Sequence, residues 1–366
     1  MVHLVVAGSI GGAERLLVDL ASRPEASGAT HSVALLSHDG RLPSFFEQAG
    51  LRVHHGGCVA QNPVNYVRTT FGKRELEWLT GVLDEEGAQV LHLHTFGSHL
   101  LGARAASRSG VPALRTEHHI YHYQYPSMSP FTRWAARGTS RFVAVSDYVR
   151  REVSRLAPST ASRMVTVRNG VDAEHFAFAP IDTRTREGKP VVFASVCRLD
   201  RWKGVDLAIE GLAAVPGAIL RVAGTGPDQA RLEATAHRAG VAERVEFLGH
   251  LTDVRPVIEE ADVAVSGSDH EPLGLSVLEA LATGRPVVAF AGGGIPEVVR
   301  HGATGWLVEE RTGQAYGAAM REAASNRERL VSMGETARSF VERECTIETM
   351  CAGYAKAYRD TLQLSL

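Results

Sequence analysis

The chain has 366 residues, of which 44% are hydrophobic, and its 39 basic and 41 acidic side chains give a formal net charge of −2. This composition is that of an ordinary globular protein, and the length predicts two domains of roughly 150–200 residues. The near-neutral balance creates no overall field that would attract a nucleic acid, so no nucleic-acid partner is expected.

The N-terminal stretch MVHLVVAGSIGG predicts a strand rather than a targeting signal. It lacks the basic start of a signal peptide, and its apolar run is too short for one. No other segment approaches the ~18–20 apolar residues of a membrane span, which leaves contact with the inner face of a membrane open. The four cysteines are far apart and form no C-x-x-C pattern, as is typical of a reduced, cytoplasmic chain.

Residues 1–172 alternate short apolar runs with amphipathic stretches. The apolar runs are rich in Val, Leu and Ala and end in turn or polar residues, which predicts buried strands. These runs lie at 3–8, 32–37, 90–94, 113–118, 141–146 and 164–169, with helical patterns between them, for example at 13–22 and 45–50. Alternation of strands and helices predicts a parallel sheet covered by helices on both faces, which is a Rossmann-like domain.

A second series of the same kind occupies residues 190–346. Its predicted strands lie at 191–196, 219–224, 245–249, 263–267 and 287–290, and its clearest helical patterns at 206–215 and 229–240. The segment 173–189 between the two series is rich in charge, Pro and Thr, as a linker is. The sequence therefore predicts an α/β protein with two facing Rossmann-like parallel-sheet domains and a cleft between them. Ligands of such sheets bind beyond the carboxyl ends of the strands.

The first predicted strand ends in GSIGGAE, which departs from the dinucleotide fingerprint G-x-G-x-x-G because Ile10 occupies the second glycine position. Gly11 and Gly12 still open a helix, where backbone N–H groups without side chains can meet a phosphate. A tight turn between strand and helix explains the same two glycines equally well. Glu14 lies in the first helical turn, where a carboxylate favours the helix dipole in either case.

Histidines cluster after two later strands of the first domain. His92 and His94 share one face of their strand, and His118 and His122 follow the next one. A zinc site built from them would need a third ligand and supporting hydrogen bonds, so polar side chains at strand ends are the commoner explanation. An intermediate interpretation places one histidine against a sugar or a phosphate. The aromatic stretch 121–134 is either a flap that binds an acceptor or a packed surface loop.

Two cations follow the first strand of the second domain. Arg198 and Lys203 lie five positions apart across a turn, and a pyrophosphate needs neutralisation from more than one direction. Solvated loop cations are the alternative. Later strand ends carry the glycine-rich segment 224–228 and the pair Gly249 and His250. Both could bring backbone amides and carbonyls near a nucleotide base.

The segment EPLGLSVLE places Glu271 in a turn and Glu279 in the helix that follows. The sequence Ser276-x-x-Glu279 matches a capping box, which would make both side chains structural. The functional alternative uses the amides of Gly274, Leu275 and Ser276 as an anion site at a helix N-terminus. The two flanking carboxylates would then accept hydrogen bonds from hydroxyl groups. A ligand with hydroxyls on both sides of a phosphate group is a nucleotide sugar.

In their order along the chain, these segments resemble the retaining glycosyltransferases of family 4, glycosyl transferases group 1, which have the GT-B fold. Residues 271–279 look like the Glu-seven-residues-Glu motif of that family. The resemblance covers nearly the whole chain, and its motifs are GGAE at 11–14, TEH at 116–118, VAVSDYVR at 143–150, RNGVD at 168–172, CRLDRWKG at 197–204, and EPLGLSVLEALATGRPVV at 271–288 followed by GGIPEVV.

For the C-terminal domain, residues 190–346, the resemblance implies binding of the sugar nucleotide. Arg198 and Lys203 would hold the donor pyrophosphate, Glu271 would contact the hydroxyls of the donor sugar, and Glu279 would contact the ribose. The helix amides would help to bind sugar and diphosphate. The implied reaction passes through an oxocarbenium-like transition state and needs neither a metal nor a cofactor.

For the N-terminal domain, residues 1–172, the resemblance implies binding of the acceptor. Gly12 would approach the donor phosphate, and His118 would lie beside the donor sugar. Residues 347–366 would form a helix that returns to this domain.

The function implied is a hexosyltransferase of a bacterial cytoplasm, with a UDP-sugar as the favoured donor. Its acceptor would be a hydroxyl of a sugar-like compound, a natural product or a lipid-linked molecule. Two alternatives stay open, namely a GT-B-type sugar-nucleotide epimerase or hydrolase and a non-catalytic sensor of sugar nucleotides.

Overall fold

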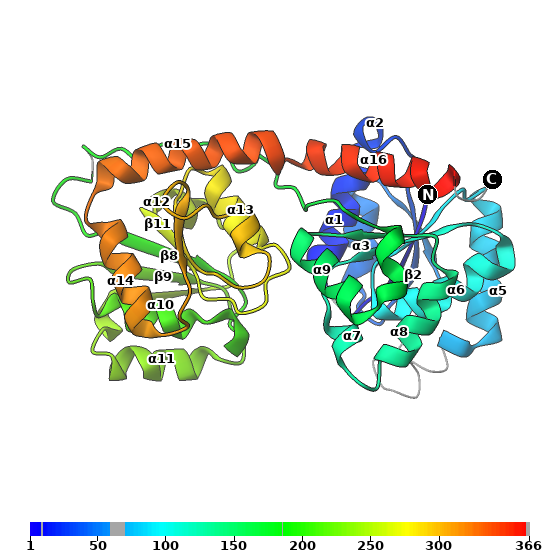
Figure 1. Cartoon of the computed structure of the whole chain (residues 1–366), viewed down its shortest axis with the longest axis horizontal. Helices are drawn as coiled ribbons and strands as arrows, with labels where there is room; N and C mark the ends of the chain where they lie inside the picture. The colour runs from blue at the N-terminus through cyan, green and yellow to red at the C-terminus, as the bar shows by residue number, and fades with distance from the viewer. Residues whose placement is uncertain (9, 59–69, 185, 364–366) are drawn as a thin grey trace. The chain divides into compact units, whose positions relative to one another are not determined.

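The computed structural model describes residues 1–8, 10–58, 70–184 and 186–363. Contacts within the chain divide it into two compact units (Figure 1). The first unit comprises Met1–Asn169 and Ile347–Leu366, and the second comprises Gly170–Thr346. None of the helices in the described part of the chain is both long and apolar enough to cross a membrane.

The first unit is built on a seven-stranded, fully parallel sheet with the order β3-β2-β1-β4-β5-β6-β7. Its strands are β1 Val2–Val6, β2 Ser32–Leu36, β3 Arg52–His55, β4 Leu91–Leu93, β5 Ala113–Glu117, β6 Arg141–Ala144 and β7 Met164–Thr166. The six predicted strands are confirmed. β3 was not among the predicted strands, because this edge strand reads RVHH and none of its side chains is fully buried.

Helices cover this sheet, and their ends follow from local sequence signals. The helices are α1 Gly12–Ala21, α2 Pro24–Ser27, α3 Arg41–Gln48, α5 Lys73–Glu85, α6 Phe96–Ser109, α7 Tyr121–Gln124, α8 Ser129–Ala135, α9 Asp147–Leu156 and α16 Ile347–Gln363. In α6, for example, the Thr95 side chain accepts a hydrogen bond from the Ser98 amide, and Gly110 ends the helix with a φ of 74°.

The C-terminal helix α16 packs on the first unit, as the sequence analysis expects. Its buried side chains recur at helical spacing, from Ile347 through Met350, Cys351 and Tyr354 to Tyr358. They form one apolar cluster with residues of α1, β5 and β6, namely Leu16, Leu20, Leu114 and Val143. Burial of this face ties residues 347–363 to the first unit.

The second unit is built on a six-stranded parallel sheet with the order β10-β9-β8-β11-β12-β13. Its strands are β8 Val192–Val196, β9 Ile219–Ala223, β10 Val245–Gly249, β11 Val263–Ser266, β12 Val287–Phe290 and β13 Gly305–Val308. The five predicted strands are confirmed, and β13 was missed because it has only four residues and starts with a glycine. The expected α/β class with two parallel sheets is therefore confirmed.

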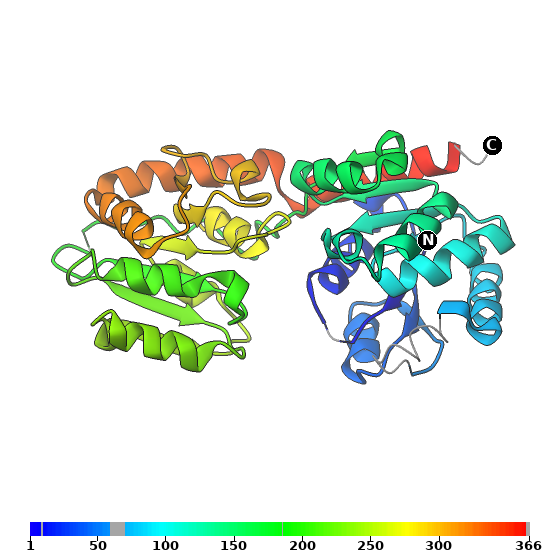
Figure 2. The same ribbon diagram turned by 60° about the horizontal axis from the view of Figure 1, so that its bottom comes forward.

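Helices lie on both faces of the second sheet (Figure 2). Side chains of α10, α11, α14 and the start of α15 pack on one face, and those of α12, α13 and the later part of α15 pack on the other. The bounds are α10 Val205–Leu212, α11 Gln229–Arg238, α12 Arg255–Glu260, α13 Leu275–Ala282, α14 Gly313–Ala324 and α15 Arg327–Glu344. Neighbouring strand residues such as Phe193 and Ala194 alternate between the two apolar clusters, as buried parallel strands require.

The expected linker, residues 173–189, lies within the second unit and is held to it by arginine side chains. These arginines donate hydrogen bonds to carbonyl groups of the segment and of Pro190 next to it. The pairs are Arg338 with Ala173 and Phe176, Arg285 with Ala179, and Arg327 with Arg186, Lys189 and Pro190. Arg285 is almost fully buried, and that burial lowers its pKa to about 10.

Candidate active site

Two of the predicted site residues in the second unit meet directly. Lys203 ends the short 3-10 turn η3, Arg201–Lys203, after β8, and Glu271 lies in the turn after β11. The Lys203 Nζ donates to Oε1 of Glu271, and only 15% and 11% of the two side chains are exposed. Trp202 packs its ring 4.1 Å from the Lys203 ammonium group. Both residues are predicted from the sequence for a donor site, but their contact with each other is not.

A close backbone approach sets this contact. A Cβ atom on Gly204 would lie 2.2 Å from the carbonyl oxygen of Gly267, and Gly204 has a φ of +63°. Only glycine allows this distance together with this conformation. The Asp269 amide also donates to the Trp202 carbonyl at 3.1 Å. The two loops after β8 and β11 are thereby held against each other.

The N-terminus of α13 presents backbone donors beside Glu271. The helix begins at Leu275, and Gly274 precedes it with a φ of +93°, where a Cβ would lie 2.7 Å from the Ile295 side chain. The amides of Leu275 and Ser276 have no hydrogen-bond partner among the described residues. Free N–H groups at a helix start form a site that suits an anion.

The capping-box alternative for Ser276 and Glu279 fails. Because Gly274 is the residue that precedes the helix, Ser276 is its second residue and cannot cap it. The structure records no side-chain cap hydrogen bond at this helix start. Glu279 lies further along α13 and is half-buried. Neither side chain therefore has the structural role that a capping box would give it.

The remaining predicted residues of the second unit lie at neighbouring strand ends. Arg198 is 72% exposed, and its guanidinium donates to Asp200 at 2.8 and 3.1 Å. The Gly224 amide donates to the Gly249 carbonyl at 2.7 Å, which joins the loops after β9 and β10. His250 is exposed just beyond β10. Arg198 and His250 thus lie on the surface, whereas Lys203 and Glu271 are largely enclosed.

One supporting segment was not assigned a role from the sequence. The glycine run 292–294 after β12 packs on the turn that carries Glu271, and the Gly294 amide donates to the Glu271 carbonyl at 2.8 Å. The signal that could have revealed it is three successive glycines after a predicted strand.

In the first unit, the glycines at the start of α1 are engaged by a side chain. The Gly11 amide donates to the Glu14 Oε2 at 2.9 Å, and Gly12 is exposed as the first residue of the helix. Glu14 itself is buried, and burial raises the pKa of its carboxyl group. A carboxylate thus already occupies the Gly11 donor that the sequence analysis offers to a phosphate. Ser9 lies outside the described residues.

His118 follows β5 and is partly exposed, while the residues around it form a buried ionic cluster. Glu117 accepts hydrogen bonds from Arg115 and from the Tyr123 hydroxyl, both at 2.7 Å, and lies 3.0 Å from His122. Burial opposes ionisation of Glu117, but Arg115 and His122 outweigh it and hold the pKa of this carboxyl group well below its usual range. The cluster fixes the backbone on both sides of His118.

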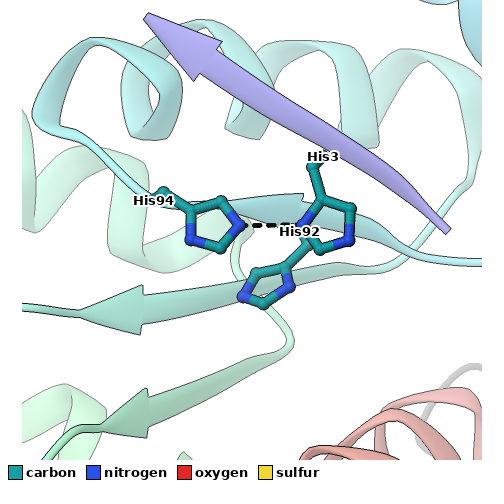
Figure 3. Close-up of side chains that lie close together, drawn as sticks. All are labelled: His3, His92 and His94. Carbon is teal, nitrogen blue, oxygen red and sulfur yellow. Dashed lines mark hydrogen bonds between the residues drawn. The ribbon is translucent and has the colours of Figure 1, made fainter. Parts of the chain in front are cut away.

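His92 and His94 share a buried site with His3 of the neighbouring strand β1 (Figure 3). One nitrogen of each ring lies within 4.8 Å of the others, a spacing that could hold a metal ion. Every ring nitrogen of the three already has a hydrogen-bond partner, however. Burial lowers the pKa of all three rings well below 6.5, so they are neutral. The geometry is that of a hydrogen-bonded cluster.

Two family models match this chain. The model described as Glycosyltransferase Family 4 matches residues 10–175, and the model described as Glycosyl transferases group 1 matches residues 181–340. The two matches therefore fall one on each half of the chain.

The chain is also similar to named enzymes and to solved structures. It is 33% identical to the GDP-mannose-dependent alpha-(1-6)-phosphatidylinositol monomannoside mannosyltransferase of Mycobacterium tuberculosis over 70% of this chain and 71% of that one. It is 30% identical to the D-inositol 3-phosphate glycosyltransferase of Geodermatophilus obscurus over 96% and 86%. The structure of Anabaena HepE in complex with UDP and glucose matches with a TM-score of 0.81 and 22% identity over 97% and 98% of the two chains, a likeness of fold.

Proposed function

The chain belongs to glycosyltransferase family 4, the group 1 glycosyltransferases with the GT-B fold, and we propose that it transfers a hexose from a UDP-sugar to a hydroxyl group with retention of configuration. The enzyme class follows from the family. The donor base, the stereochemistry and the acceptor are proposals. One observation carries the proposed donor site: the enclosed pair Lys203 and Glu271 lies beside the amides of Leu275 and Ser276, which have no partner among the described residues.

The proposed chemistry follows from the charges of this site. As the bond between the sugar and the diphosphate breaks, negative charge grows on the leaving phosphate. Lys203 and the amides of Leu275 and Ser276 would stabilise that charge where it develops. Arg198, on the exposed side, would neutralise the far phosphate. The acceptor oxygen bonds to the anomeric carbon on the face that the phosphate leaves, and the phosphate oxygen takes the acceptor proton.

Glu271 and Glu279 would bind the neutral parts of the donor. A carboxylate accepts hydrogen bonds from vicinal hydroxyls, so Glu271 would hold the sugar and Glu279 the ribose. Gly249 and His250 would lie near the base. In the first unit, Gly12 would approach the phosphates and His118 would contact the sugar.

A thermal-shift screen combined with product analysis tests this function. UDP and UDP-sugars at about a hundred times Kd are expected to raise the melting temperature of the second unit by about 5 °C, because they bind only the folded state. NMR coupling constants of the anomeric centre give the configuration of the product, and retention means that it equals the configuration of the donor. A melting-temperature shift with GDP compounds alone would mean that the donor base is guanine rather than uracil. A product of inverted configuration would refute retention. Donor hydrolysis without transfer to any hydroxyl acceptor would refute the proposed reaction.

An exposed aromatic stripe supports a lipid-linked acceptor and contact with a membrane surface. Four large side chains at three-residue spacing are 37–53% exposed from the end of α7 through α8. They are Tyr125 and Met128, which lie between the two helices, and Phe131 and Trp134 in α8. Phe71, equally exposed, lies 6.3 Å from the ring of Phe131. The stretch 118–146 contains no Asp or Glu but includes the exposed Arg133 and Arg137. Aromatic rings beside cations suit an anionic lipid surface.

Binding to vesicles checks this surface. The protein is expected to co-sediment with vesicles that contain phosphatidylglycerol and not with phosphatidylcholine alone. The double variant Phe131→Ser with Trp134→Ser should bind roughly tenfold more weakly, because two rings no longer leave water. Phe178→Ser, an exposed aromatic in the second unit, is the matched control and should bind like the parent. Equal binding of both variants would rule out this patch.

A further inference from the structure

A continuous chain of hydrogen-bonded imidazoles leads to His118. The Ser27 hydroxyl lies 2.9 Å from Nε2 of His31, and Nδ1 of His31 lies 2.7 Å from Nε2 of His3. Nδ1 of His3 is 2.9 Å from Nε2 of His94, as the dashed line in Figure 3 marks. Nδ1 of His94 is 3.3 Å from Nε2 of His118. Ser27 lies in α2, His31 just before β2, His3 in β1, and His94 and His118 just after β4 and β5.

All four imidazole rings of this hydrogen-bond chain are neutral, so the hydrogen bonds between them must all be donated in the same direction. Burial is the main cause that lowers the pKa of His31 to about 4 and of His118 to about 3, and it lowers those of His3 and His94 well below 6.5. A neutral imidazole donates from one nitrogen and accepts at the other. Each ring therefore donates toward the next in one common sense, and the group at the end of the chain decides which sense it is.

The Ser27 end decides this direction. The Ser27 hydroxyl is buried and lies 3.3 Å from the Pro24 carbonyl and 3.5 Å from the Ala29 carbonyl. A carbonyl only accepts, so the single hydroxyl proton satisfies one of these contacts when His31 donates to the oxygen. His3 then donates to His31, His94 to His3, and His118 to His94. The opposite direction would use the hydroxyl proton on His31 and give up the hydrogen bond from Ser27 to a carbonyl, although the Pro24 carbonyl accepts from the Gly28 amide at 2.9 Å in either case.

We propose that this chain is a positioning device that holds His118 with Nε2 protonated and turns the lone pair of Nδ1 toward the substrate. His118 would then accept a hydrogen bond from a sugar hydroxyl rather than donate one to a sugar oxygen. His3, His31 and His94 act through His118 and touch no substrate themselves. The sugar contact rests on the proposed function, whereas the protonation pattern of the chain does not.

His92 keeps the chain in place from the side. Its ring lies 4.1 Å from that of His94 between centroids, and its two nitrogens bond to Thr116 and Tyr358 at 2.8 and 2.9 Å. These hydroxyls, and that of Tyr354 on Thr116, satisfy His92 outside the chain. No member of the chain therefore has to give up a nitrogen to His92.

The direct test is NMR of the ligand-free protein labelled with ¹⁵N in its histidines. Long-range ¹H–¹⁵N correlations distinguish a protonated ring nitrogen from an unprotonated one, and single His→Gln variants assign the signals. We expect His118 to show a protonated Nε2 and an unprotonated Nδ1 at pH 7. The opposite tautomer, or an equal mixture, overturns the proposal. So does a stoichiometric shift of the His3 and His94 signals on adding Zn²⁺ alone, since the rings would then be ligands.

Variants of His3 link the chain to turnover. His3→Phe cuts the chain, so His118 should become a tautomer mixture and kcat should fall about fivefold, the size of one hydrogen bond, with KM little changed. His3→Gln keeps a donor and an acceptor and should restore most of the rate. His99→Phe replaces an equally buried histidine that bonds to Thr139 outside the chain and should leave the His118 signals unchanged.

The outcomes distinguish the positioning role of the histidines from the proposed sugar contact. Unchanged His118 signals and an unchanged kcat in His3→Phe overturn the positioning role. If His3→Phe does not fold, His31→Phe interrupts the chain at its partly exposed end and is read in the same way. Full transfer by His118→Ala would overturn the sugar contact, while the tautomer found in the ligand-free protein would stand independently.

Discussion

Lys203→Ala is expected to lower kcat/KM for sugar transfer by about a hundredfold to a thousandfold, the usual effect of removing one preorganised charge partner of a developing anion. Lys203 is the enclosed cation of the site, whereas Arg198 is exposed and bonded to Asp200. Arg198→Ala should therefore lower kcat/KM less than Lys203→Ala does. Initial rates with saturating acceptor measure both. Arg201→Ala removes an exposed cation from the same turn and should transfer at the parental rate.

The ion pair with Glu271 makes a stability control necessary. Removing Lys203 leaves a largely enclosed carboxylate without its partner, which costs about 1–3 kcal/mol of unfolding free energy. The double variant Lys203→Ala with Glu271→Ala should regain part of that stability and stay inactive. Recovery of transfer together with stability would mean that the pair only supports the fold, and near-parental rates in Lys203→Ala would refute the donor site.

Mild acid is expected to unfold the first unit before the second. Burial is the first cause that lowers the pKa of His3, His31, His92, His94, His99 and His118. The unfolded chain, with histidine pKa values of about 6.5, then binds more protons than the folded one below that pH. His31, whose pKa is lowered to about 4 in the folded protein, reduces the free energy of unfolding by about 2 kcal/mol at pH 5. The other five rings act in the same direction, because burial lowers their pKa values as well, and the stability of a domain is only ~5–15 kcal/mol.

The second unit provides the internal comparison. Its five histidines, at positions 175, 237, 250, 270 and 301, are all exposed. Glu14 acts in the opposite direction, because burial raises its pKa, but it is a single group. The measurement is urea unfolding at pH 7.5 and at pH 5, followed by hydrogen-exchange pulses at one common pH and mass spectrometry of peptides from each unit. Equal loss of stability in both units would contradict the role of the buried rings.

The strands and the class of fold could be predicted from sequence because buried parallel strands leave continuous apolar runs. The strands that were missed show the limit of that signal. β3 is polar, as an edge strand can be, and β13 starts with a glycine and has four residues. The start of α13 was also misjudged in one interpretation, since a matching Ser and Glu spacing does not show which residue precedes the helix.

The candidate site was predictable in its members and not in their contacts. Lys203 and Glu271 follow different strands, and nothing in the sequence fixes the approach of Gly204 to Gly267 that joins their loops. His3 and His31 gave no signal, because a single histidine near a strand usually satisfies the core. Only the parallel register that sets His3 beside His92 brings these rings together. Distances between side chains from separate strands depend on the order and register of the strands in the sheet. No local sequence pattern specifies that order and register.

The arginines that hold residues 173–189 reach this segment through its carbonyl oxygens, which carry no net charge and do not titrate. Arg327 and Arg338 also pair with the carboxylates of Asp262 and Glu342. High ionic strength screens pairs of opposite charges, yet it has little to screen where the acceptor is a peptide group. Lysine could not make the same contacts as Arg338, because Nη1 lies 2.9–3.0 Å from three carbonyl oxygens while a second nitrogen, Nε, donates to Glu342 at 2.7 Å. The carbonyl contacts should therefore persist at high ionic strength and in mild acid, whereas the ion pairs of Arg186 and Arg327 with Asp262 weaken under both conditions.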